Sequence, residues 1–168
     1  MGATGRVSAH ATLPSEYALV GGGARTWWEH PPWPGSLLTA SFGSSDTWTA
    51  EAKDHVTPSP VVVTAFAIGL SRALMARIGV HVISASDTSH LLQHRPSATA
   101  DLTVGFAAAP GAVGVMTGGG ARSDSQGPGS LLITSDPKDK TKWIAASKDH
   151  EVPDPTTVES FAFGLVAV

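Results

Sequence analysis

The sequence contains no cysteine and no asparagine, and it has few charged residues. Without cysteine, disulfides, zinc–thiolate sites and thiol nucleophiles are excluded. Without asparagine, the chain offers no acceptor for N-glycosylation. Charged residues make up 15% of the chain, against about 25% in a typical soluble domain. The formal net charge of −3 at pH 7 argues against a nucleic-acid partner that is held by a basic surface.

Long apolar runs are also missing. The stretches rich in Val, Leu and Ala are short and interrupted by Gly, whereas a membrane-spanning helix needs about 20 consecutive apolar residues. Residues 1–16 are polar and lack the apolar region of a signal peptide. We therefore expect no membrane partner and a cytoplasmic location, with secretion possible if the sequence has been trimmed.

What is present points to one all-β domain over residues 1–168. The 18 Gly and 12 Pro are too many for a helical bundle, whereas the 42% hydrophobic content suffices for a core. Short segments bounded by Gly, Pro, Asp or Ser predict strands. The predicted strands are 36–42, 48–52, 61–70, 80–86, 100–107, 113–117, 130–135, 143–147 and 156–166. Residues 71–78, with Ser71 as N-cap, are predicted to form a short helix or another strand.

Alternation along these strands predicts which side chains form the core, because successive residues of a strand point to opposite faces. The predicted core faces are Trp48, Ala50 and Ala52; Trp143, Ala145 and Ser147; Phe66, Ile68 and Leu70; and Phe161, Phe163 and Leu165.

An internal repeat is the strongest signal in the sequence. Three motifs occur twice in the same order, with an offset that drifts between 94 and 97 residues. They are Gly-Gly-Gly-Ala-Arg at 21–25 and 118–122, Pro-Gly-Ser-Leu-Leu at 34–38 and 128–132, and Lys-Asp-His at 53–55 and 148–150. The chain is therefore the product of a duplication.

The number of repeats has two interpretations. Segment 71–112 has weak similarity to the clear copies, so the repeats are placed at about 17–70, 71–112 (degenerate) and 113–165. Three such units would pack around a pseudo-threefold axis as in a β-prism or, as an alternative, a β-trefoil. The competing interpretation is a β-barrel or sandwich built by two-fold duplication from units of about 95 residues.

The Lys-Asp-His tripeptide is the candidate for acid–base chemistry. In the first copy it is Lys53, Asp54 and His55; the second copy is Lys148, Asp149 and His150. Adjacent residues on a strand point to opposite faces, so the Asp and His need not pair. The structural alternative is a strand end at which Asp accepts hydrogen bonds from turn backbone.

The Gly-Gly-Gly-Ala-Arg segment has both a functional and a structural interpretation. Arg25 and Arg122 are candidates to hold an anionic group of a ligand. The structural alternative is a Gly-rich strand or bulge at which sheets approach closely.

The two copies differ most at segment 26–33, the Trp segment, which contains three of the five Trp. The matching segment 123–127 has none. Trp27, Trp28 and Trp33 are predicted to stack on a sugar or another flat ligand. Glu29 and His30 would supply hydrogen bonds or transfer protons. A plug over one end of the fold, or a subunit contact, is the alternative. The repeated Trp48 and Trp143 are further candidates for ligand contacts, giving two similar sites.

A metal site and a cofactor are not predicted. His90 and His94 have the four-residue spacing of helical metal ligands, but the segment resembles a loop and no third ligand is evident.

Three functions fit these observations. The first is a lectin-like, carbohydrate-binding β-repeat protein whose partner is a glycan or another small molecule. The alternative is a small cofactor-independent lyase, isomerase or cyclase, with its acid–base residues in the first copy. The third is an assembly protein whose Trp segment mediates homo-oligomer contacts.

Overall fold

The computed structural model describes residues 5–27, 35–107, 111 and 113–167. These residues form mostly strands, with two short helices, and this confirms the all-β prediction. The first part of the chain forms β1 (Arg6–Thr12), β2 (Tyr17–Trp27), β3 (Ser36–Ser44), β4 (Thr47–Asp54), β5 (Val62–Ser71), α1 (Arg72–Ile78) and β6 (Val80–Thr88). The second part forms β7 (Ser97–Asp101), α2 (Thr103–Phe106), β8 (Val113–Ser123), β9 (Ser130–Pro137), β10 (Lys142–Asp149) and β11 (Val158–Ala167). Neither helix is long and apolar enough, within the described residues, to span a membrane.

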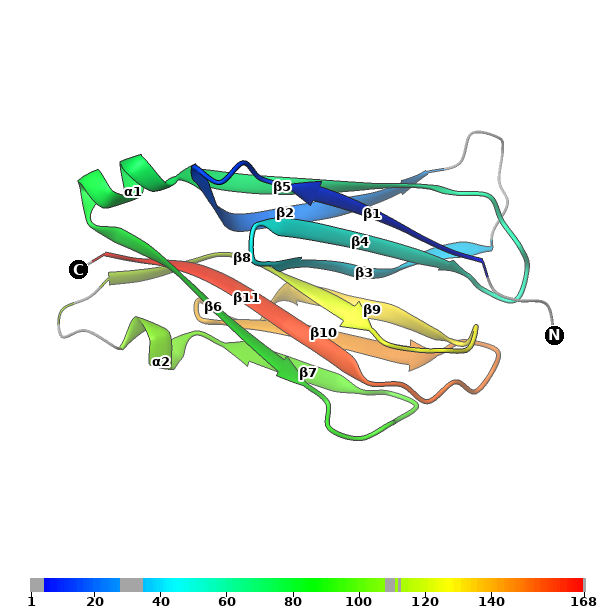
Figure 1. Ribbon diagram of the computed structural model, residues 1–168. Helices are drawn as coiled ribbons and strands as arrows, with labels where there is room; N and C mark the ends of the chain where they lie inside the picture. The colour runs from blue at the N-terminus through cyan, green and yellow to red at the C-terminus, as the bar shows by residue number, and fades with distance from the viewer. Residues whose placement is uncertain (1–4, 28–34, 108–110, 112, 168) are drawn as a thin grey trace.

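The strands form three sheets. The largest has six strands in the order β1-β4-β3-β8-β11-β6, and the others are β7-β10-β9 and β2-β5. β1 to β5 lie together in the upper half of Figure 1, and the later strands lie below them. The pairing of β3 with β8, at Ala40↔Arg122 and Ser41↔Ala121, joins the two halves.

The same pattern of strand pairing occurs twice along the chain. β1-β4-β3 has the same order as β7-β10-β9, and β2 pairs with β5 as β8 pairs with β11. Even the registers agree, since Gly22↔Ala67 in the first copy corresponds to Gly119↔Ala162 in the second. The β-prism and β-trefoil are not confirmed, because β6 joins the sheet of β11 and β7 joins that of β10. The two-fold alternative and the limits of the repeats stay predictions.

The Gly-rich motif provides flat surfaces for two tryptophans. A Cβ atom on Gly22 would lie 2.3 Å from the ring of Trp48, and one on Gly119 would lie 2.2 Å from the ring of Trp143. Trp48 is 1% exposed and packs with Leu19 and Phe163. This close packing supports the structural interpretation of the motif, because any larger residue would displace the indole.

The predicted core faces are partly right. Trp48, Ala50 and Ala52 are buried as expected, as is Phe163. The prediction for β5 is wrong, because Phe66 and Ile68 are 50% and 59% exposed while their neighbours Ala65 and Ala67 pack against the cluster around Trp48. The indole fills the space inside β5, so only small side chains fit on that face.

The predictions for segments 71–78 and 100–107 gave one success and one failure. The helix expected at 71–78 is α1, and Ser71 caps it by accepting a hydrogen bond from Leu74 N–H. Gly79, with φ of 68°, ends the helix in the left-handed conformation that favours glycine. The strand predicted over 100–107 is wrong beyond Asp101, where β7 stops. The Asp101 carboxylate accepts a 2.8 Å bond from the N–H of Thr103, the first residue of α2.

Candidate functional site

Lys53 reaches from the first copy of the repeat into the second. Its side chain is fully buried. The ammonium donates to Ser125 Oγ and to the Gly127 carbonyl, the latter at 2.6 Å, and lies 3.4 Å from Asp154. Burial lowers the pKa of Lys53, although Asp154 opposes this shift. With three acceptors around an enclosed ammonium group, Lys53 connects the two copies, and its side chain is closed to solvent.

The two repeated histidines meet at the same junction. His55 is 8% exposed, and its Nδ1 donates a 2.9 Å hydrogen bond to the Pro128 carbonyl, which has no proton to give. Its Nε2 lies 2.7 Å from Nδ1 of His150 and 4.0 Å from the carboxylate of Glu151. Residues 95 positions apart thus form one cluster, and the sequence motif provided the two histidines but no sign that they meet.

The aspartates of the tripeptide do not pair with the adjacent histidines. Asp54 accepts hydrogen bonds from the backbone N–H groups of Gly5 and Ser59, both at 3.1 Å. Asp149 contacts His94 Nδ1. Asp54 thus has the turn-stabilising role that the structural interpretation gives it, while Lys148, the counterpart of Lys53, is exposed.

The predicted tryptophan contacts are corrected in part. Trp48 is 1% exposed, so its ring has no face for a ligand. Trp143 packs against the core cluster around Leu102 and donates a hydrogen bond to Ser135 Oγ. Trp27 is 38% exposed at the end of β2. The other residues of the predicted Trp segment lie outside the described residues: Trp28, Glu29, His30 and Trp33.

The two repeated arginines differ in their surroundings. Arg25 is exposed on β2. Arg122 lies over the ring of Phe42, 5.8 Å from its centroid, and 3.7 Å from the carboxylate of Asp124. Asp124 therefore competes with any anion for Arg122.

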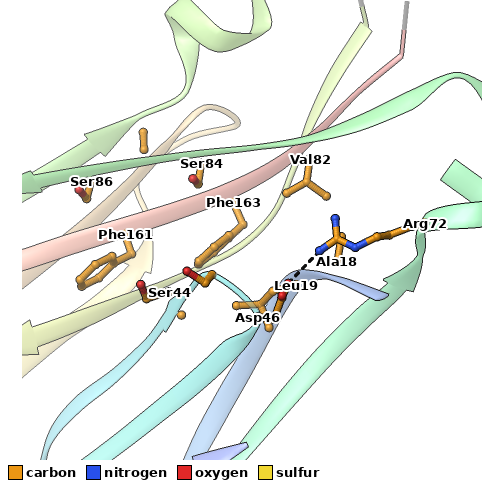
Figure 2. A pocket seen from close by; sticks show the side chains of 13 residues that line it. Ala18, Leu19, Ser44, Asp46, Arg72, Val82, Ser84, Ser86, Phe161 and Phe163 are labelled. Carbon is orange, nitrogen blue, oxygen red and sulfur yellow. Dashed lines mark hydrogen bonds and ion pairs between the residues drawn. The ribbon is translucent and has the colours of Figure 1, made fainter. Parts of the chain in front are cut away.

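A cleft that the sequence analysis missed lies where the two halves of the molecule meet. Figure 2 shows it between β2, the turn from β3 to β4, the start of α1, and strands β6 and β11. Its volume is about 580 Å³. The lining residues are Ala18, Leu19, Gly43, Ser44, Ser45, Asp46, Arg72, Val82, Ser84, Ala85, Ser86, Phe161 and Phe163.

The cleft combines an ion pair, hydroxyl groups and aromatic rings. Arg72 donates to Asp46 at 2.9 Å, and both side chains are substantially exposed. Ser84 and Ser86 lie on one face of β6 and are exposed. Phe161 and Phe163 contribute apolar surface from β11 (Figure 2). The alternation of Ser along β6 was the one sequence signal available, but nothing in the sequence placed β6 opposite Asp46.

Comparison with protein-family models, with curated proteins and with solved structures finds no match to this chain.

Proposed function

We propose that this protein binds a small polyhydroxylated ligand of the carbohydrate class in the cleft between its two halves. The observation that carries the proposal is the joint presence of the Asp46–Arg72 ion pair, Ser hydroxyls and the partly exposed ring of Phe161 around one opening. Carboxylate and guanidinium groups accept and donate hydrogen bonds with hydroxyl groups, and aromatic rings pack against the C–H faces of a sugar.

The arrangement suits a neutral polyol better than a charged ligand. Arg72 and Asp46 already neutralise each other at 2.9 Å, so neither sign of charge dominates the opening. The remaining polar groups on the lining side chains are Ser hydroxyls, each of which both donates and accepts. A ligand with many hydroxyl groups satisfies all of them.

The proposal moves the carbohydrate site away from the predicted tryptophans. Leu19 lines the cleft, whereas Trp27 lies at the other end of β2, about 26 Å along the strand at roughly 3.3 Å per residue. The enzyme alternative gains no support from this cleft, because neither Lys53 nor His55 lines it.

A glycan array probed with the wild-type protein tests the proposal, with Arg72→Ala and Arg77→Ala alongside. Both arginines lie on α1 and are exposed, but only Arg72 lines the cleft. We expect selective binding that Arg72→Ala weakens by about tenfold or more, as expected for a hydrogen bond to a charged group, and that Arg77→Ala leaves unchanged. A blank array with folded protein, or equal binding by both variants, overturns the proposal.

A further inference from the structure

The cluster at the junction of the two copies contains three metal-ligating side chains. His55, His150 and Glu151 each offer one ligand atom, and these atoms lie within 4.8 Å of one another. We infer that this cluster binds one Zn²⁺ ion, with His55 Nε2, His150 Nδ1 and the Glu151 carboxylate as ligands. The inference is independent of the cleft, which shares none of these residues.

Hydrogen bonding fixes which nitrogen of His55 faces the ion. Nδ1 donates to the Pro128 carbonyl at 2.9 Å, so the neutral ring has its lone pair on Nε2. A backbone carbonyl that orients a ligating imidazole in this way is the usual outer-shell partner of a metal-bound His. His55 is therefore a preoriented and buried anchor for the ion.

The short contact between the rings marks the place for a cation. His55 Nε2 and His150 Nδ1 lie 2.7 Å apart, so without a metal a proton of His150 occupies the space between two lone pairs. Zn²⁺ would take the place of that proton, and the neutral His150 ring would then hold its single proton on Nε2 instead of Nδ1.

The distances suit a tetrahedral ion. Zinc–nitrogen bonds of 2.0–2.1 Å separate tetrahedral ligands by about 3.3 Å. The two nitrogens lie 2.7 Å apart and His55 Nε2 lies 4.0 Å from the carboxylate, and all three ligand atoms lie within 4.8 Å of one another. The exposed side chains of His150 and Glu151 supply the small adjustment. Two imidazoles and one carboxylate are a ligand set that leaves a fourth position for water, and imidazole nitrogen favours zinc over magnesium or calcium.

The duplication explains why the part of the chain that the structure describes has one such cluster and not two. Glu151 and its counterpart Val56 both adopt left-handed backbone, with φ of 60° and 61°, so the turn is common to both copies. Only the second copy has a carboxylate in this turn. The site therefore needs one His from each copy and a Glu from one, which is why the sequence analysis, with its ligands 95 residues apart, expected no metal.

Titration of the full-length, chelator-stripped protein with zinc chloride, followed by calorimetry, tests the inference. We expect one Zn²⁺ per chain and a higher Tm with zinc present, because an ion that binds the folded state stabilises it. Replacing a ligand, in Glu151→Gln or His150→Gln, should weaken binding by about tenfold or more, the loss that even outer-shell changes cause at metal sites. His90→Gln, an exposed His elsewhere, is the matched control and should bind zinc normally.

Because the altered ligands are exposed, both variants should keep the wild-type circular dichroism spectrum. Three outcomes overturn the inference: no zinc binding by the wild-type chain, full binding by the double variant His150→Gln/Glu151→Gln, or an equal loss in His90→Gln.

Discussion

At the scale of single residues, the contacts between tryptophan rings and glycines explain a motif that resembles a ligand-binding loop. Gly22 and Gly119 each lie directly against an indole, whereas Gly23, in the same motif, has open space where a Cβ would be. None of the three has a positive φ. Conformational freedom is therefore not the reason for glycine here, and the missing side-chain volume is.

This difference gives a prediction within one motif. Gly119→Ala should destabilise the protein by about 1–3 kcal/mol, the usual cost of overpacking, because the new methyl group would lie 2.2 Å from Trp143 and 2.5 Å from the Phe161 carbonyl. Gly23→Ala should change the free energy of unfolding by less than about 0.5 kcal/mol. Urea denaturation of both variants measures this, and equal losses would contradict it.

At the scale of elements, the two copies of one strand have opposite environments. Ile68 on β5 and Phe163 on β11 occupy the same repeat position, yet Ile68 is 59% exposed and Phe163 is 5% exposed. Phe163 is buried because Trp48 of the other copy lies 5.9 Å away, between ring centroids. The burial of a repeated position thus depends on which copy covers it.

Truncation of each side chain tests this difference. Phe163→Ala should cost about 3–5 kcal/mol, the range for a buried phenylalanine. Ile68→Ala should cost less than about 1 kcal/mol, because most of that side chain is already in water. Thermal unfolding of the two variants gives the comparison, and a loss for Ile68→Ala as large as that for Phe163→Ala would refute it.

The same elements show how far the sequence could be interpreted. Strand alternation and the repeat predicted the all-β class and the burial of Trp48, Ala50 and Ala52, because these depend on local periodicity. The exposure of Phe66 and the meeting of His55 with His150 depend on how the copies pack, which periodicity does not encode. Likewise, the cleft uses Asp46 and Ser84 from opposite halves, and neither stood out in its own segment.

At the scale of the whole molecule, one buried ion pair connects the copies. Lys53 comes from β4, and Asp154 follows the second copy's histidine turn. Asp154 also accepts from the backbone N–H groups of Gly127 at 3.2 Å and Ser130 at 3.1 Å, which holds the segment that surrounds the ammonium group. The carboxylate therefore has two roles, neutralising Lys53 and ordering the segment, and a double-mutant cycle separates them.

Asp154→Asn keeps the shape of the side chain but leaves the ammonium of Lys53 buried without a counter-charge. We expect it to cost about 3–5 kcal/mol, as when one partner of a buried pair is removed. In a Lys53→Met background the same change should cost only about 1–3 kcal/mol, because no buried cation is left to neutralise and the remaining loss is one backbone N–H bond, since Asn has a single acceptor oxygen. Lys148→Met, at the exposed counterpart position, should leave the cost of Asp154→Asn unchanged. Urea denaturation of the variants measures the coupling. An equal cost of Asp154→Asn with and without Lys53 would mean that the carboxylate only orders its segment, and that the copies are held together by packing and by the pairing of β3 with β8.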